Sequence, residues 1–232
     1  MKSKIKKSIK IAFLFALLFI EISCEKKKPI ELDKRPIDAN AHIYDTIQIG
    51  EQVWMKQNFR GSKFIDSSDI PNNLNHEEWQ RNILGASSNY NGDVNNDIIY
   101  GKLYNWYAVK KGILAPKGWH IADVKDWDEL NNFLGLTNAG DNMKATCVWE
   151  KDSRCDNTNS SGFSALPSGV RNHVVTYDGD RQGAYFWTPT ISYTKNGEIH
   201  PWNYQIGYNH PNMGKENNYH PPYGLAIRCV KD

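Results

Sequence analysis

The amino-acid sequence predicts an α+β domain built from two short helices, small antiparallel sheets and long loops. Only two stretches have helical character, and much of the remainder alternates short strand-like runs with turns. The chain also holds 24 asparagines, 17 glycines and 10 prolines, which are residues typical of turns and loops. All eight tryptophans follow residue 50, so aromatic rings must form much of the core.

The first 23 residues have the composition of a secretory signal peptide. A lysine-rich start, MKSKIKKSIK, precedes an unbroken apolar run, IAFLFALLFI. A bilayer-spanning helix needs about 20 apolar residues, so this shorter run fits the apolar region of a signal peptide better. We therefore expect residues 1–23 to be removed from the mature protein.

The residues around Cys24 resemble the lipobox of bacterial lipoproteins. Ser23 is the small residue before the cysteine, although Glu21 stands where the motif usually has an aliphatic side chain. The resemblance implies that Cys24 is acylated and anchors the chain in the lipid bilayer, because several acyl chains together hold a protein stably. The predicted location is the cell envelope, at the outer membrane. Simple secretion is the alternative.

Residues 24–43 predict a flexible tether, and residues 44–232 a single folded domain. The tether has many charges, two prolines and few apolar side chains, although an extended arm packed on the domain is an alternative. Beyond residue 23 the chain carries 23 basic and 25 acidic residues, so the positive excess of the whole chain belongs to the leader. This balance excludes a nucleic-acid partner recognised through excess positive charge.

Strands are predicted at both ends of the domain. IYDTIQIGEQVWM (residues 43–55) has strand composition with a break at Gly50-Glu51, which predicts a hairpin. In the closing GLAIRCVKD, Leu225, Ile227 and Cys229 alternate as in a half-buried last strand. Between them, from Gly162 onward, short strand-like runs alternate with turns.

Two helices are predicted between these ends. One runs over residues 124–134, because Asp123 can cap its start, Asp126 suits its first turn and Gly135 can end it. Its apolar side chains fall on one face: Val124, Trp127, Leu130, Phe133 and Leu134. The second is predicted within GKLYNWYAVK, residues 101–110.

Five blocks of sequence carry a family resemblance. In order they are DTIQIGEQVWMKQNFR, NYNGDVNNDIIYGKLYNWYAV, APKGWHIADVKDWDELNNFLG, SGFSALPSGVR and GLAIRCVKD. Over about residues 44–232 they resemble the Fibrobacter succinogenes major paralogous domain, a family of secreted bacterial lipoprotein modules. That family is similar to the C-type-lectin-like fold, which implies two helices, intertwined small sheets and both termini in one sheet. The resemblance implies no activity.

The cysteines suggest one disulfide. With Cys24 assigned to the lipid, three cysteines remain in an oxidising compartment. We favour a bond between Cys147 and Cys155, which close a short loop; pairing of Cys229 with either, or no disulfide, is the alternative. The family often has a cysteine where this chain has Ala115, so the resemblance implies that Cys229 lacks its partner and is a buried thiol.

Aromatic and amide side chains gather in the last third of the chain. Their rings can stack on a glycan or protein ligand, and their amides can hydrogen-bond to it. For each of them a role in the core or in a turn is the alternative. The predicted ligand-binding set is Trp187, Trp202, Asn203, Tyr204, Tyr208, Asn217 and Tyr219.

Two patterns bear on metal binding. Asp93, Asn95 and Asp97 place oxygen ligands at alternate positions, as at the start of a calcium loop, but Ile98 stands where such a loop needs glycine. Calcium is therefore a weak candidate, and no cofactor is predicted. The dipeptides His200-Pro201, His210-Pro211 and His220-Pro221 recur every ten residues. They either bring imidazoles together at a metal or, as we favour, mark successive turns.

No spacing pairs a catalytic acid with a base, and FSALPSG is not the strand–turn–helix of a nucleophile elbow. We therefore expect no catalysis and favour an envelope-anchored, lectin-like binding module for a glycan or an envelope protein. One alternative is an oxidase-like enzyme related to the formylglycine-generating enzymes, which have a segment similar to GWHIADVKDWDE. The other is a structural envelope lipoprotein without a ligand.

Overall fold

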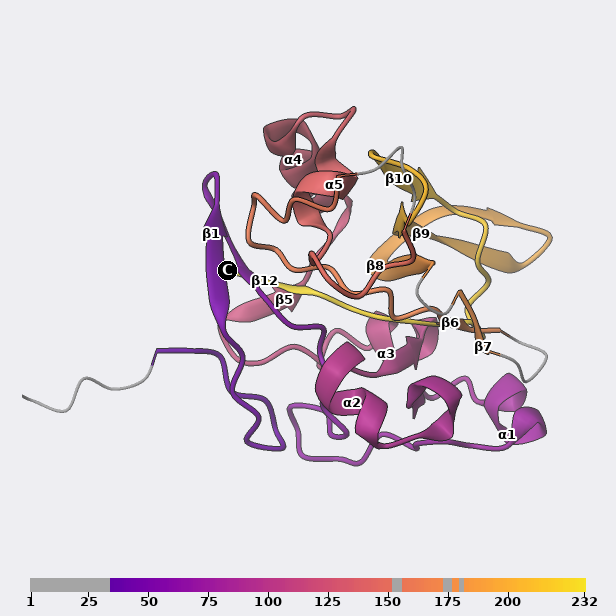
Figure 1. The fold of residues 1–232 in the computed structure, drawn as a ribbon. Helices are drawn as coiled ribbons and strands as arrows, with labels where there is room; N and C mark the ends of the chain where they lie inside the picture. The colour runs from indigo at the N-terminus through magenta and orange to yellow at the C-terminus, as the bar shows by residue number, and fades with distance from the viewer. Residues whose placement is uncertain (1–33, 152–155, 173–176, 180–181) are drawn as a thin grey trace, which may run out of the picture. The chain divides into compact units, whose positions relative to one another are not determined.

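The computed structural model describes residues 34–151, 156–172, 177–179 and 182–232, and it confirms the α+β class (Figure 1). These residues form five short α-helices, where the sequence predicted two. The helices are α1 (His76–Arg81), α2 (Asn95–Tyr100), α3 (Trp106–Lys110), α4 (Val124–Leu134) and α5 (Ala139–Met143), with a 3-10 turn at Tyr90–Gly92. Within this described part, no helix has the length and apolar character needed to cross a bilayer.

The described strands form three small antiparallel sheets. The terminal sheet has the order β1 (Thr46–Ile49), β2 (Gln52–Met55), β12 (Cys229–Lys231) and β5 (Trp119–Ile121). The middle sheet has the order β3 (Ser87–Ser88), β4 (Leu103–Asn105), β11 (Gly224–Leu225), β6 (Val170–Arg171) and β7 (Tyr177–Asp178). The hairpin sheet has the order β10 (Met213–Glu216), β9 (Glu198–Gly207) and β8 (Gly183–Lys195).

The predicted N-terminal hairpin is present, and the last strand pairs with it. Gly50 takes the positive φ of 60° that the turn between β1 and β2 requires. Trp54 of β2 is the ladder partner of Val230 of β12, so the first and last strands share one sheet, as the family resemblance implies. Figure 1 shows β12, in yellow, beside β2 and β5.

The segment from Gly224 to Lys231 contacts all three sheets. It supplies β11 to the middle sheet and β12 to the terminal sheet. Between them, Ala226 forms a parallel bridge with Phe186 of β8, and its carbonyl accepts from the Trp187 N–H at 3.0 Å. The terminal and middle sheets, whose strands are two to four residues long, would be only marginally stable alone. Their common segment therefore joins the sheets into one structure.

This closing segment is buried on both faces, not half-buried as predicted. Leu225, Ile227 and Cys229 point into one aromatic-rich core, whereas Ala226 and Val230 point into a second. The alternation was read correctly, but its second face meets another core in place of solvent. The sequence prediction failed there because Arg228, on that second face, suggests exposure.

Arg228 is completely buried among backbone oxygens and aromatic rings. Its guanidinium donates to Asn58 Oδ1 at 2.6 Å and to the Met55 carbonyl at 2.8 Å. It also donates to the carbonyls of Phe163 at 3.0 Å and Ser164 at 3.2 Å, and lies 4.2 Å from the centroid of the Phe163 ring. One side chain therefore joins the last segment to the end of β2 and to the 163–164 loop.

Helix α4 has the predicted limits and caps. Asp123 accepts hydrogen bonds from the N–H groups of Lys125 and Asp126 at the first turn, and Gly135 ends the helix at a φ of 87°. Trp127 and Leu130 are buried as expected. Phe133 differs, since 63% of it is exposed; its ring packs on Gly50, where a side chain would come within 3.1 Å of it.

The second predicted helix is shorter than expected. The first part of residues 101–110 is strand β4, because Leu103 and Tyr104 pair with β3 and β11. Only Trp106–Lys110 is helical, capped by the Asn105 side chain, which accepts from the Ala108 N–H at 3.2 Å. The late strands also depart from the prediction, since β8 and β9 form a long hairpin closed by Asn196 and Gly197, both at positive φ.

The folded unit begins at about Lys34, ten residues before the predicted boundary at 44. Asp38, placed in the flexible tether by composition, is only 6% exposed. Its carboxylate accepts from the Tyr44 hydroxyl at 2.6 Å and from the N–H groups of Asn40 and His42. Residues 34–43 therefore pack as an arm on the domain. The signal peptide, Cys24 and the rest of the predicted tether lie outside the described residues.

Substitution of Arg228 tests how far it organises the fold. Arg228→Met would leave four buried oxygens without their donor, and we expect the free energy of unfolding to fall by about 3–5 kcal/mol. The matched control is Arg81→Met, because Arg81 is 79% exposed and pairs only with Glu77 on the surface. There we expect a change of at most about 0.5 kcal/mol. Urea unfolding measures both; equal losses would contradict the assigned role.

His120 should make stability depend on pH. Its ring nitrogens lie 3.0 Å from Asp126 and 2.8 Å from Asp232, and the bond to Asp126 leads in raising the pKa of His120 to about 9. A raised pKa stabilises the fold fully below pH 6.5, and that contribution is lost as the pH rises through 9. Because the side chain is 42% exposed, we expect a loss of only about 1 kcal/mol. His120→Gln should abolish this part of the pH dependence in urea unfolding; an unchanged slope would contradict it.

Cys229 should be inert to thiol reagents in the folded protein. It is completely buried, as the resemblance implied, and burial raises the pKa of its thiol far above the ordinary value. Cys147 is exposed, but Cys155 lies outside the described residues, so the proposed disulfide stays a prediction. Maleimide labelling followed by mass analysis should leave Cys229 unmodified until urea is added. Labelling of Cys147 and Cys155 in the native state would exclude their disulfide, and native labelling of Cys229 would contradict its burial.

Candidate ligand-binding site

The structure divides the predicted ligand-binding set by burial. Trp187, Asn203 and Tyr204 are completely buried. The Trp187 indole donates to the Tyr104 carbonyl at 2.9 Å, and the Tyr204 ring stacks on Trp127 with centroids 5.4 Å apart. These three residues build the interior beneath the surface, because strands β8 and β9 carry them into the cores.

The other four members are half-buried. Trp202 lies under the Lys215 ammonium, 5.1 Å from its ring centroid, and the Asn217 amide donates to the Ser192 hydroxyl at 3.0 Å. Tyr219 packs edge-on against Tyr185. Of the predicted set, only Tyr208 lines a hollow at the end of β9 on the described surface.

This hollow is the candidate ligand pocket, with a volume of about 360 Å³. It lies at the end of β9, where the chain turns through residues 208–212 into β10. Amides and rings dominate its wall. The lining residues used below are Gln182, Tyr185, Gln205, Tyr208, Asn209, His210, Asn212 and Glu216.

Helix α5 holds the loop that forms one wall of the pocket. The Asp141 N–H donates to the Pro211 carbonyl at 2.9 Å, and the buried Lys144 ammonium donates to the His210 carbonyl at 2.8 Å. Gly140 allows this close approach, because a Cβ there would come within 2.5 Å of the Asn212 carbonyl oxygen. The Lys144 charge is balanced by Asp141 at 2.9 Å. The loop is therefore fixed to a helix, so the pocket is largely preformed.

The pocket amides are available to a ligand. Within the described residues, the side chains of Gln205, Asn209 and Asn212 make no hydrogen bond to the protein. Each amide offers two donors and an acceptor. Gln205 lies between the buried residues Tyr204 and Ile206, so strand alternation turns it to the opposite side. The pocket can thus hydrogen-bond a polar ligand and stack it on a phenol ring.

Sequence analysis missed most of this pocket. The predicted set rests on aromatic side chains and the asparagines beside them, so it does not include Gln182, Gln205, Asn212 and Glu216. The alternation around Gln205 was a readable signal. The contribution of Gln182 could not be predicted, because this residue precedes β8 and is far from Tyr208 in sequence. The fold brings the two residues together, and the Gln182 carbonyl accepts from the Tyr208 N–H at 2.8 Å.

The calcium candidates serve local structure. Asp93 accepts from the backbone and side-chain N–H groups of Asn95, both at 2.9 Å, at the entry to α2. Asp97 pairs with the nearly buried Lys102 at 2.6 Å. Its second oxygen, Oδ1, is buried with no hydrogen-bond partner among the described residues. Calcium binding at this segment stays a prediction.

The three His-Pro dipeptides lie in different parts of the fold. His210 lines the candidate pocket. His200 and His220 lie together elsewhere, with ring centroids 5.0 Å apart, and Glu198 joins them. The prediction that these dipeptides mark turns is wrong for His200-Pro201, which lies within β9, whereas His220 begins a turn in which its carbonyl accepts from the Tyr223 N–H at 2.9 Å.

Comparison with known proteins gives a family and nothing finer. Residues 47–231, most of the chain, match the family described as the Fibrobacter succinogenes major domain. No curated protein and no solved structure matches the chain. The match covers the terminal, middle and hairpin sheets from β1 to β12, in agreement with the resemblance seen in the sequence. The chain therefore belongs to the Fibrobacter succinogenes major domain family.

Proposed function

We propose that this protein is a non-catalytic binding module, anchored in the bacterial envelope, that holds a glycan in the pocket at the end of β9. The observation that carries the proposal is the group of pocket amides with no hydrogen bond to the protein within the described residues. A preformed hollow lined by such groups, with Tyr185 and Tyr208 beside them, suits a ligand rich in hydroxyls.

The chemistry of the pocket favours a sugar over an acyl or peptide substrate under attack. Glycan hydroxyls both donate and accept, as amides do, and the apolar face of a sugar ring can lie on an aromatic ring. The described residues that line this hollow include no serine, cysteine or lysine, which are the usual nucleophiles. Its volume of about 360 Å³ is at the small end of ligand sites, which suits a terminal or short glycan.

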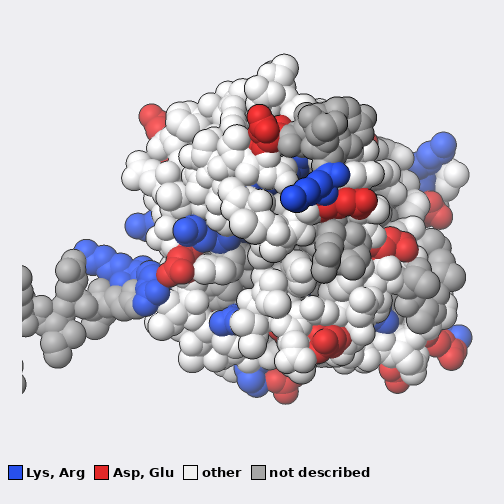
Figure 2. Space-filling model, viewed as in Figure 1, with Lys and Arg blue, Asp and Glu red and all other residues white. Residues whose placement is uncertain are grey.

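The charge distribution favours an uncharged ligand. Figure 2 shows acidic and basic side chains interspersed on one face of the molecule, with broad uncharged areas between them. Among the described residues that line the pocket there is a carboxylate, Glu216, and no lysine or arginine. A polyanionic ligand would meet repulsion there, so a neutral glycan is the better fit.

The leader and Cys24 support the location. A signal peptide over residues 1–23 and acylation of Cys24 would attach the mature chain to the lipid bilayer of the outer membrane, with residues 25–33 as the remaining tether. The folded unit would then present its pocket to glycans of the envelope or its surroundings.

Binding on a glycan array tests the proposal. Full-length protein in detergent should bind a defined set of neutral glycans. Gln205→Ala and Asn209→Ala should each weaken binding of the best one by about 10-fold, the value of roughly one lost hydrogen bond, measured by calorimetry. Gln48→Ala is the matched control, because this exposed amide lies on β1 and makes only a 3.3 Å bond to Gly50.

Thermal unfolding checks that the variants fold. Absence of glycan binding by the wild-type protein, or equal affinity of the Gln205→Ala and Gln48→Ala variants, would contradict the proposal.

A further inference from the structure

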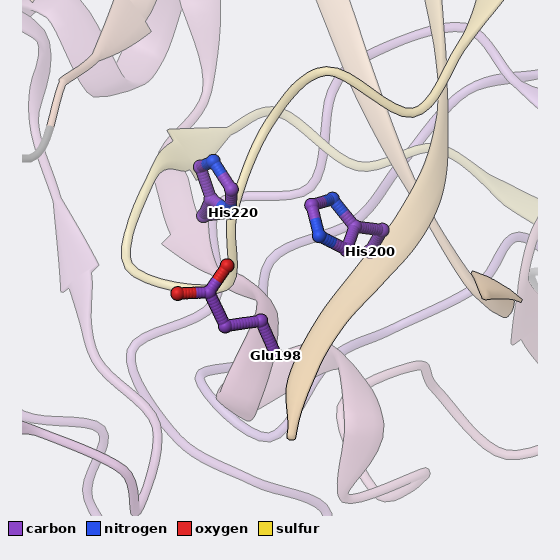
Figure 3. Close-up of side chains that lie close together, drawn as sticks. All are labelled: Glu198, His200 and His220. Carbon is purple, nitrogen blue, oxygen red and sulfur yellow. The ribbon is translucent and has the colours of Figure 1, made fainter. Parts of the chain in front are cut away.

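Three metal-binding side chains meet at the tip of the β8–β9 hairpin, away from the candidate pocket. Glu198 and His200 come from the start of β9, and His220 from the loop between β10 and β11 (Figure 3). Each offers one ligand atom, and these atoms all lie within 4.8 Å of one another. Glu198 and His220 are exposed, so solvent and ions reach the group.

Local structure explains why the group is gathered. Glu198 and His200 are two residues apart on a strand, so their side chains share one face. Both histidines precede proline, which restricts their backbone to extended conformations and lowers the entropy lost on binding. His220 is twenty residues from His200 in sequence and lies in the loop that carries Tyr219 into the core of Leu225, Ile227 and Cys229.

His200 is the fixed member of the group. It is 9% exposed, and Tyr193, its ladder partner on β8, stacks on the imidazole with centroids 4.2 Å apart and planes at 13°. The His220 ring meets the His200 ring at 62°, with centroids 5.0 Å apart. An imidazole held in this way keeps its orientation when a ligand arrives.

The three side chains are not committed to other partners. Among the described residues none of them makes a hydrogen bond or an ion pair, although Lys195 stands opposite Glu198 in the ladder. His220 also lines a hollow of about 310 Å³ with Tyr223, so its ring is open on one side. A metal would therefore displace no hydrogen bond or ion pair of the described residues.

We propose that Glu198, His200 and His220 form a Zn²⁺ site. Two imidazoles and a carboxylate suit zinc, whose bonds of about 2.0–2.2 Å put tetrahedral ligand atoms about 3.4 Å apart. The ligand atoms already lie within 4.8 Å of one another, and the exposed side chains of Glu198 and His220 can rotate to bring them closer. Water completes the fourth position. The bound ion would link the hairpin tip to the 217–223 loop.

Zinc titration of the full-length protein tests the site. Calorimetry with ZnCl₂ alone should show one site, and His220→Ala and Glu198→Gln should each weaken it by at least about 10-fold, since even outer-shell changes at zinc sites have effects of this size. His210→Ala is the matched control: it removes an imidazole of the same His-Pro type outside the group and should leave zinc affinity unchanged.

Two readouts keep the result independent of folding. Zinc should raise the melting temperature of the wild-type protein and of the His210→Ala variant, but not that of Glu198→Gln, whose exposed side chain can be changed without disturbing the core. Co²⁺ should give the visible absorption of a tetrahedral site only where Glu198 and both histidines are intact. Absence of zinc binding by the wild-type protein, or wild-type affinity in both His220→Ala and Glu198→Gln, would overturn the proposal.

Discussion

The buried guanidinium of Arg228 is the interaction on which the arrangement of the three sheets depends. The strands of the terminal and middle sheets are only two to four residues long, too short for either sheet to be stable alone, and the two sheets are joined by the extended segment around this side chain. Burial lowers the pKa of Arg228 to about 9, so the group is still charged at pH 7. Oxygens of Met55, Asn58 and the 163–164 loop replace its water shell. Arginine suits this place because its fork satisfies several acceptors at once, which no apolar residue can do.

The same segment fixes the position of both proposed sites. Ala226 binds the backbone of β8 next to Phe186 and Trp187, and β8 pairs with β9 along most of its length. Strand β9 then places Gln205 in the candidate pocket and His200 in the proposed zinc site. Helix α5 adds a second support through Asp141 and Lys144. Both proposed sites therefore lie on loops and strand ends around a scaffold whose interior is aromatic and closely packed.

Local signals were sufficient for the parts of the fold with local causes. Gly50 marked the first hairpin, and Asp123 with Gly135 marked the limits of α4, because turns and caps are decided by neighbouring residues. Burial of Asp38, Lys144 and Arg228 could not be read in this way. Arg228 is satisfied by oxygens far away in sequence, and Lys144 donates to the distant His210 carbonyl. The partners of Asp38 lie within six residues of it, but the polar composition of residues 24–43 predicted a tether there. The prediction of the candidate site was incomplete for a different reason. Aromatic character does not distinguish the core residue Trp187 from the pocket residue Tyr208, because both lie in strand-rich sequence and only the fold decides which of them faces a core.

The two proposed sites lie near opposite ends of β9, and this separation bears on how they could act. His200 and Gln205 are five residues apart on the strand, or about 17 Å at roughly 3.3 Å per residue. They also share no side-chain contact among the described residues. Effects of changes this far apart are usually additive. The candidate pocket can therefore form without the metal, since α5 and β10 already hold it. Zinc would act instead on the hairpin tip and the 217–223 loop, where Tyr219 packs against the core of Leu225, Ile227 and Cys229, and so would stabilise the side of the domain that α5 does not reach.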